Sequence, residues 1–238
     1  MALHFELGDI PVEVVKKDIK NIHLSVYPPS GAVRVSAPLR MKLDTIRVFA
    51  ISRLSWIKQQ QIKLRAQERE TPREYIERES HYVWGKRYLL KVVEADTAPT
   101  LELKHSRIVL RVRPGTSEAA RQAIMAHWYR GQIRVTVPAL IAKWEAIMGV
   151  KVERIFVQKM KTQWGSCNPT ARSIRLNTDL AKKPLQCLEY IVVHELVHLL
   201  ERHHNDRFMR LMAQYMPDWQ QRRQVLNGAP LGHEDWGY

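Results

Sequence analysis

The sequence predicts an α+β protein with two packed lobes, a β-rich N-terminal lobe over residues 1–115 and a more helical lobe over residues 116–238. In much of the first half, apolar and polar residues alternate with the period of two that is typical of half-buried strands. From Glu118 onward, apolar residues instead recur every three or four positions, as they do on the buried face of a helix. Because no Gly/Ser-rich linker separates the halves, we expect the lobes to pack against each other.

The first lobe is expected to be a small antiparallel sheet with one long helix. Strand-like alternation runs from Phe5 to Pro38 and returns between His81 and Val112. A turn at Pro28–Gly31 divides the first of these regions and indicates a hairpin. Between the two regions, apolar residues from Leu43 to Leu64 recur at helical spacing, and Pro72 must end this helix. We interpret this lobe as a scaffold.

The helices of the second lobe are predicted from helical spacing and from glycine and proline. Helical spacing begins at Glu118, is expected to be interrupted around Gly131 and Pro138, and ends at Gly149. A last helix is expected over Trp219–Leu226. The segment between these helices carries the candidate chemistry.

The apolar run Tyr190–Leu200 contains the pattern H-E-x-x-H and is expected to form a buried helix. His194 and His198 then lie one turn apart on one helix face, so both imidazoles can bind the same metal ion. Glu195 lies among apolar residues, where a carboxylate without a partner costs several kcal/mol. A catalytic zinc ion keeps one position open for water and lowers its pKa to about 7, so Glu195 is the candidate general base. The pattern is short enough to occur by chance on a polar helix, but its apolar surroundings favour the metal site.

A third ligand is expected from His204, six residues after His198. Six residues correspond to about 600° of helical rotation, so His204 reaches the metal only if the helix ends near Arg202 and the chain turns back. Asn205 or Asp206 is suited to cap a new helix at this point. His204 is therefore preferred, and the alternatives are His203, Asp206 and Asp218.

Three segments carry a resemblance to a known family. The runs Met160–Cys167, Ile174–Asn177 and Leu188–His198 resemble the YgjP-like zinc metallopeptidases, which are relatives of the SprT-like proteases. The resemblance spans most of the chain and is strongest over Val152–Trp219.

The resemblance implies a zincin-like metallopeptidase lobe with an H-E-x-x-H helix, preceded by the β-rich lobe. It implies Zn²⁺ held by His194, His198 and His204, with Glu195 as the catalytic acid/base. One position departs from the family's pattern, because Gln163 stands where such proteins often carry arginine. This departure leaves the metal site unchanged but makes a role of this side chain in substrate binding doubtful.

A small sheet is expected immediately before the H-E-x-x-H helix. Alternation predicts one strand over Val152–Gln158, and a second, short strand is expected around Ile174–Leu176. Between them lies a predicted turn whose first residues are Trp164, Gly165 and Ser166. An exposed edge strand of such a sheet would pair with the backbone of an extended polypeptide substrate. These three turn residues are therefore the candidate substrate-binding residues, although core packing is the favoured interpretation of Trp164.

The composition favours association with polyanions. The chain carries 38 Lys and Arg residues against 24 Asp and Glu residues, a formal net charge of +14. This excess favours nucleic acid as a partner because phosphate contacts release counterions, but the charges are scattered along the chain. Two alternatives therefore stand beside the metallopeptidase: a DNA-associated, SprT-like protein-processing protease, and a non-enzymatic zinc-binding module. The intact Glu195 favours chemistry.

The cysteine count and the hydropathy indicate a compartment. Cys167 and Cys187 are too few for a disulfide framework and form no C-x-x-C pair. No apolar run reaches the roughly 18–20 residues of a membrane span, and the first residues lack the pattern of a signal peptide. We therefore expect a cytoplasmic protein with reduced thiols and no membrane partner.

Overall fold

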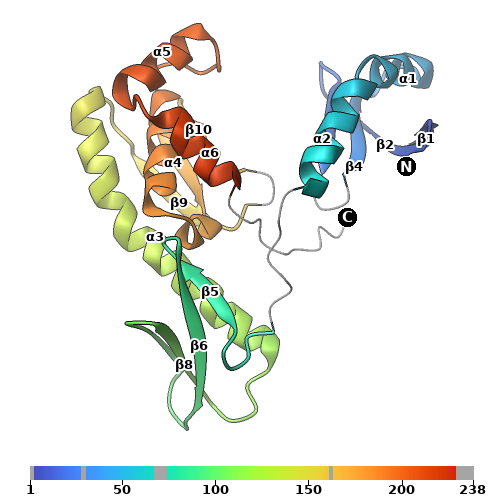
Figure 1. Cartoon of the computed structure of the whole chain (residues 1–238). Helices are drawn as coiled ribbons and strands as arrows, with labels where there is room; N and C mark the ends of the chain where they lie inside the picture. Colours follow the sequence, from blue (N-terminus) through green and yellow to red (C-terminus); the bar gives the residue numbers. More distant parts are fainter. Residues whose placement is uncertain (1–2, 28–30, 67–73, 161–162, 229–238) are drawn as a thin grey trace. The chain divides into compact units, whose positions relative to one another are not determined.

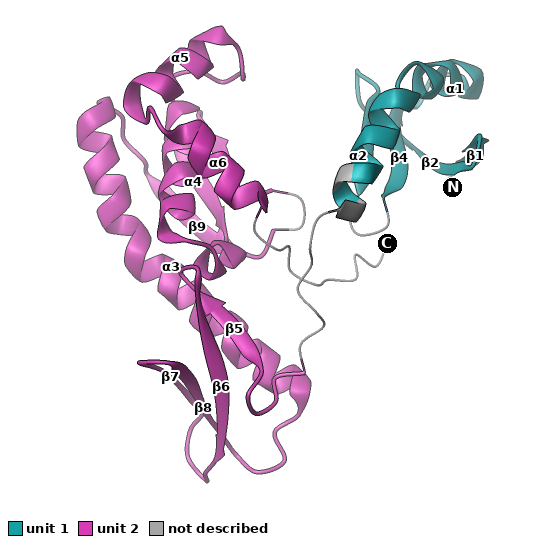
Figure 2. Ribbon diagram, in the orientation of Figure 1, with its two compact units in different colours: residues 1–71, 230–238 teal, residues 72–229 magenta. Residues whose placement is uncertain are grey.

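The computed structural model describes residues 3–27, 31–66, 74–160 and 163–228. The chain divides into two compact units, residues 1–71 with 230–238 and residues 72–229 (Figure 2). Each unit has a hydrophobic core of its own.

The division between the compact units differs from the lobe boundary that we placed at residues 115 and 116. Strands after residue 80 belong to the second unit because their apolar side chains pack into the same core as the helix that follows residue 117. Leu90 and Leu110 from the strands share this core with Met125 from the helix. The sequence shows the change of period near residue 115 but not this shared core.

The first unit contains a four-stranded sheet with the strand order β1-β2-β4-β3 (Figure 1). The outer pairs β1·β2 and β3·β4 are antiparallel, whereas the central pair β2·β4 is parallel. The expected strands are therefore confirmed, but the prediction of an antiparallel sheet was wrong for the central pair, because β3 lies outside β4 and β4 pairs with β2 in parallel. The residues of the predicted Pro28–Gly31 turn lie outside the described residues, apart from Gly31. Its strands are β1 (Leu3–Leu7), β2 (Ile10–Lys17), β3 (His23–Tyr27) and β4 (Ala32–Pro38).

Two helices, α1 (Leu43–Ser52) and α2 (Leu54–Ala66), cover one face of this sheet. The prediction of one long helix was wrong, because the helix is interrupted at Arg53 (φ −108°, ψ 7°). The backbone N–H of Arg53 donates to the carbonyl of Ala50, three residues earlier, and this tight turn closes α1. Ile46 and Ile57 keep the two helices anchored in the core.

The second unit begins with a four-stranded sheet of the order β5-β6-β8-β7. Its outer pairs are again antiparallel and its central pair β6·β8 is parallel, so both sheets share one topology. The predicted strands between His81 and Val112 are thus confirmed. The sheet consists of β5 (Ser80–Val83), β6 (Lys86–Glu94), β7 (Thr100–Lys104) and β8 (Arg107–Val112).

A single long helix, α3 (Glu118–Met148), follows this sheet. The predicted interruptions at Gly131 and Pro138 were wrong, since the helix runs through both. Pro138 donates no backbone hydrogen bond to the carbonyl of Arg134, one turn earlier. Both residues lie on the exposed face of α3, where water can satisfy this carbonyl. Gly149 ends the helix in the left-handed conformation (φ 67°), as expected.

The C-terminal part of the second unit combines a three-stranded sheet with a central helix, α4. The sheet has the order β10-β11-β9, so β10 is an edge strand, antiparallel to β11. The predicted turn at Trp164, Gly165 and Ser166 was wrong in part, because β10 begins at Gly165. Helix α4 contacts β10, β11 and the helices α3, α5 and α6 (Figure 1). The elements are β9 (Arg154–Gln158), β10 (Gly165–Asn168), β11 (Ser173–Asn177), the 3-10 helix η1 (Thr178–Lys182), α4 (Leu185–Val197), α5 (Asp206–Tyr215) and α6 (Trp219–Gly228).

Within the described residues, no helix combines the length and the apolar character of a membrane-spanning segment.

Candidate metal centre

Helix α4 is buried on almost every side. Between Cys187 and Val197 most of its side chains are apolar and buried, which explains why the H-E-x-x-H segment forms a helix in the middle of the unit. His194 is half-buried in its last turn, and His198 is the C-terminal cap. Both imidazoles therefore lie at the end of the helix, where the chain leaves the core.

The chain turns back directly after α4, as the spacing of His204 requires. The His198 Nδ1 atom lies 3.1 Å from the carbonyl oxygen of Glu201, so this carbonyl orients the ring within the turn. Asn205 caps the next helix, since its side chain accepts a hydrogen bond of 3.0 Å from the backbone N–H of Phe208. The helix break and the new cap bring His204 back to the end of α4.

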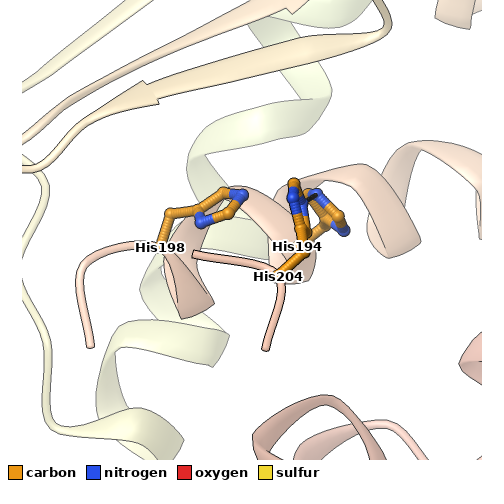
Figure 3. Close-up of side chains that lie close together, drawn as sticks. All are labelled: His194, His198 and His204. Atoms are coloured by element: carbon orange, nitrogen blue, oxygen red, sulfur yellow. Dashed lines mark hydrogen bonds between the residues drawn. The ribbon is translucent and has the colours of Figure 1, made fainter. Parts of the chain in front are cut away.

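Three histidines converge at this turn. The potential ligand atoms of His194, His198 and His204 all lie within 4.8 Å of one another. The Nε2 atoms of His194 and His204 are 3.0 Å apart, and Figure 3 shows the His198 ring pointing toward these two rings. Among the residues that the structure describes, this cluster includes neither His203 nor Asp206. The remaining alternative, Asp218, pairs with Arg222 in α6.

Phe208 forms the floor of this histidine cluster. Its ring centroid lies 5.0 Å from that of His194, 4.8 Å from that of His198 and 4.7 Å from that of His204. The side chain is only 2% exposed, so it fixes the positions of all three imidazoles from below.

The surroundings of His194 and His198 disfavour their protonated forms. Burial, followed by the neighbouring His198 and His204, lowers the pKa of His194 to about 3. Burial also lowers the pKa of His198. Neutral imidazole is the form that binds metal ions, and three imidazole nitrogens with an open side match the donor set of a catalytic zinc site. The residues therefore fit the metal that the sequence implies.

Glu195 lies beside the cluster, between α4 and the edge strand β10. Its side chain is buried (4% exposed for the residue), and burial raises its pKa to about 8. A Cβ atom at Gly165 would lie 2.5 Å from the Glu195 Oε1 atom and 2.9 Å from the Ile191 Cγ2 atom. Only glycine therefore lets β10 approach the carboxylate this closely.

An open cleft with a volume of about 870 Å³ contains these groups. Its lining includes all three histidines, Glu195 and the predicted residues Trp164, Gly165 and Ser166. The cleft thus joins the candidate metal centre to the edge strand. Trp164 is half-buried and packs against the core as well, in agreement with its expected packing role.

Asn177 holds the segment that leads into the edge strand. Its Nδ2 group donates to the carbonyls of Met160 (2.8 Å) and Gln163 (2.9 Å). Its backbone N–H donates to the carbonyl of Trp164 (2.9 Å), and its Oδ1 atom accepts from the backbone N–H of Asp179 (3.1 Å). The buried amide therefore holds Met160, Gln163 and Trp164 in place, and the last two of these residues line the cleft.

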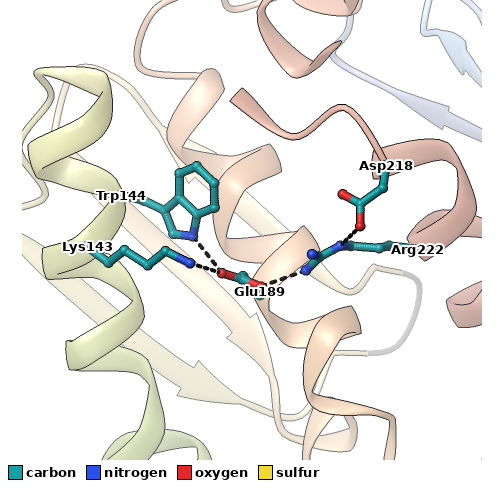
Figure 4. Close-up of polar contacts among 5 residues, drawn as sticks. All are labelled: Lys143, Trp144, Glu189, Asp218 and Arg222. Atoms are coloured by element: carbon teal, nitrogen blue, oxygen red, sulfur yellow. Dashed lines mark hydrogen bonds and ion pairs between the residues drawn. The ribbon is translucent and has the colours of Figure 1, made fainter. Parts of the chain in front are cut away.

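A polar network anchors α4 from the opposite side (Figure 4). Glu189 accepts hydrogen bonds from Lys143 (2.7 Å) and Trp144 (3.1 Å) of α3 and from Arg222 (2.6 Å) of α6. Arg222 also pairs with Asp218 (2.8 Å). Burial alone would raise the pKa of Glu189, but the hydrogen bonds from Lys143 and Arg222 lower it overall. The network therefore fixes α4 between the helices α3 and α6.

Both cysteines are free thiols, as expected. Burial, together with the charge of Glu195, raises the pKa of Cys167 to about 12, although this residue lines the cleft. Such a thiol is protonated at neutral pH and is a poor nucleophile.

Sequence reasoning missed two residues that shape this site, Phe208 and Asn177. At Phe208 the sequence shows only an apolar residue in the predicted helix after His204. Asn177 ends one of the runs that carry the family resemblance, but its positioning role was not predicted, because its side chain donates to backbone carbonyls 14 and 17 residues earlier in the sequence.

Comparison with known proteins places the chain in a family. The family described as "YgjP-like, metallopeptidase domain" matches residues 20–229. No curated protein shows significant similarity to the chain. Among solved structures, the metallopeptidase zymogen abylysin of Pyrococcus abyssi is similar at 19% identity over 38% of this chain and 88% of its own, with a TM-score of 0.34. The zymogen jannalysin of Methanocaldococcus jannaschii is similar at 18% identity over 38% and 92%, also with a TM-score of 0.34. Because the family match covers most of the sequence, the chain belongs to the YgjP-like metallopeptidase domain family.

Proposed function

We propose that the protein is a zinc-dependent metallopeptidase with a zincin-like site that hydrolyses peptide bonds inside polypeptide chains. In this proposal, His194, His198 and His204 bind the zinc ion. Glu195 acts as the general base. The observation that carries the proposal is the convergence of three imidazoles in a cleft that also contains a buried carboxylate and an exposed strand edge.

The groups around Glu195 suit proton transfer. A bound zinc ion would supply Lewis acidity, which lowers the pKa of a water molecule and polarises the scissile carbonyl. Glu195 accepts the proton of the attacking water and later donates it to the leaving amine. Its buried position excludes competing water, and the missing side chain of Gly165 leaves room for the carboxylate.

The edge strand β10 offers a backbone surface for the substrate. Its partner β11 lies on one side, so the N–H and C=O groups of the opposite edge remain available for pairing. An extended peptide that adds to this edge would run along the cleft past the histidines. Backbone pairing of this kind supports endopeptidase activity on unfolded chains.

The alternative of a purely structural zinc site is less favoured. A structural zinc is usually enclosed by four protein ligands, whereas the described residues provide three and these line an open cleft.

The proposal is tested by comparing the wild-type chain with Glu195→Gln. Zinc content is measured by atomic absorption, and cleavage is measured on an unfolded protein substrate. We expect one equivalent of zinc in both proteins and cleavage by the wild type only. Equal cleavage by both proteins would contradict the role of Glu195, and absence of zinc from the wild type would contradict the metal centre.

A further inference from the structure

Two arginines line the cleft without a carboxylate partner. Arg175 comes from β11, and Arg202 comes from the turn between His198 and His204. Within the part of the chain that the structure describes, no carboxylate is paired with either guanidinium. Other cations of this unit do pair with carboxylates, as Arg111 does with Glu102. Further examples are Lys143, Lys151, Lys182 and Arg222.

Arg175 lies directly behind the strand edge that would bind the substrate. It is the register partner of Ser166 on β10 and of Phe156 on β9, so the three side chains share one face of the sheet. The guanidinium is held over the Phe156 ring, 5.4 Å from its centroid. Because Ser166 is small, it does not cover the arginine from the side of the substrate. A long side chain of a peptide paired with β10 could therefore reach Arg175 across Ser166.

Arg202 lies in the turn that carries His198 and His204. It is exposed, and its position between two histidines of the cluster keeps it at the mouth of the cleft. The two guanidiniums thus come from different elements of the cleft lining, β11 and the turn after α4.

The charge of the cleft is positive. Glu195 is the only carboxylate among the described residues that line it. A divalent cation held by the three histidines would make the cleft still more positive. Cations of one sign in a concave site attract ligands of the opposite sign and reject those of the same sign.

We propose that this cleft selects acidic polypeptide segments, with Arg175 and Arg202 as the specificity-determining residues. Each guanidinium would bind the carboxylate of an Asp or Glu side chain close to the scissile bond, in the bidentate geometry that arginine favours. The inference rests on the proposed peptidase function, which it deepens by naming the class of substrate.

The first test compares two matched peptides that differ only by Glu or Gln at the positions flanking one cleavage site. The wild type is expected to cleave the Glu peptide with a kcat/KM at least about fivefold higher than that of the Gln peptide. One charge-assisted hydrogen bond contributes about a fivefold change or more. Arg175→Gln and Arg202→Gln are each expected to reduce this ratio, and the double variant to abolish it. Arg134→Gln, on the exposed face of α3, is the matched control and should keep the ratio. Raising the salt concentration should also reduce the preference.

A binding measurement separates failure of this inference from failure of the proposed function. The Kd values of both peptides are measured by fluorescence anisotropy with zinc-loaded Glu195→Gln, alone and combined with the arginine variants. Cleavage of both peptides at equal rates would overturn the inference and leave the peptidase standing. If neither peptide is cleaved, the proposed function fails for these substrates, and the binding data decide the inference. Tighter, arginine-dependent binding of the Glu peptide would support it. Equal binding of both peptides would overturn it.

A single-stranded oligonucleotide serves as the competitor in the same binding assay. Displacement of the Glu peptide at oligonucleotide concentrations at least about tenfold below those of unlabelled Glu peptide would show that the cleft prefers phosphates. This result would overturn the assignment of acidic peptides as the ligand class.

Discussion

Substitution of Gly165 by alanine tests how closely the edge strand must approach Glu195. The added Cβ atom would lie 2.5 Å from Glu195 Oε1 and 2.9 Å from Ile191 Cγ2, whereas ordinary contacts of a Cβ atom begin near 3.4 Å. Ile191 is buried in the core and has little room to move. The carboxylate or the strand must therefore shift by about 1 Å.

The expected effect of this shift is a loss of rate without a loss of metal. Displacement of a catalytic group by about 1 Å lowers the rate on the order of 100-fold. The three atoms nearest to the added Cβ belong to Glu195 and Ile191 and not to a histidine, so zinc content should stay at the wild-type level. The assay is kcat/KM on one peptide together with zinc analysis.

Gly131→Ala is the matched control for Gly165→Ala. No atom lies within 4 Å of a Cβ atom at Gly131, which is inside helix α3. There the same chemical change should stabilise the helix by about 0.5–1 kcal/mol and leave activity unchanged. Full activity of Gly165→Ala would refute the inferred contact between the strand and the catalytic carboxylate.

Three further predictions concern the residues that support the site. Phe208→Ala removes the floor of the histidine cluster, so zinc affinity in a chelator competition should fall about 10–100-fold, and an unchanged affinity would contradict this role. Asn177→Ala leaves the carbonyls of Met160 and Gln163 without their partner, so KM should rise at least about fivefold with zinc retained, and an unchanged KM would argue against a positioning role. Glu189→Gln should lower the free energy of unfolding at pH 7 by about 1–2 kcal/mol, or the Tm by about 3–6 °C. This range allows for solvent screening of the hydrogen bond between Lys143 and Glu189. Because the folded pKa of Glu189 is lowered, its contribution is present above about pH 4.3 and lost as the pH falls further, so the Tm difference should shrink in acid.

The candidate metal centre was predictable where its determinants are local. The pattern of His194, Glu195 and His198 depends only on helical geometry, and the structure places this segment in α4 and its cap. The return of His204 followed from the need for a helix break, and Asn205 supplies the expected cap. These features lie within one short stretch of sequence.

The fold was less predictable where neighbours distant in sequence decide the structure. Helix α3 continues through Pro138 because this residue faces solvent, which its type alone does not reveal. Strand β10 consists of small and polar residues without alternation, and pairing with β11 makes it a strand. The shared topology of the two four-stranded sheets has no counterpart that we recognise in the sequence.

The most direct test of the central claim is the X-ray absorption spectrum of the zinc-loaded wild-type chain. A catalytic site on His194, His198 and His204 predicts three imidazole nitrogens at about 2.0–2.1 Å and one oxygen ligand from water. Four protein ligands, or a sulfur ligand at about 2.3 Å from Cys167 or Cys187, would indicate a structural zinc site instead and would contradict the account.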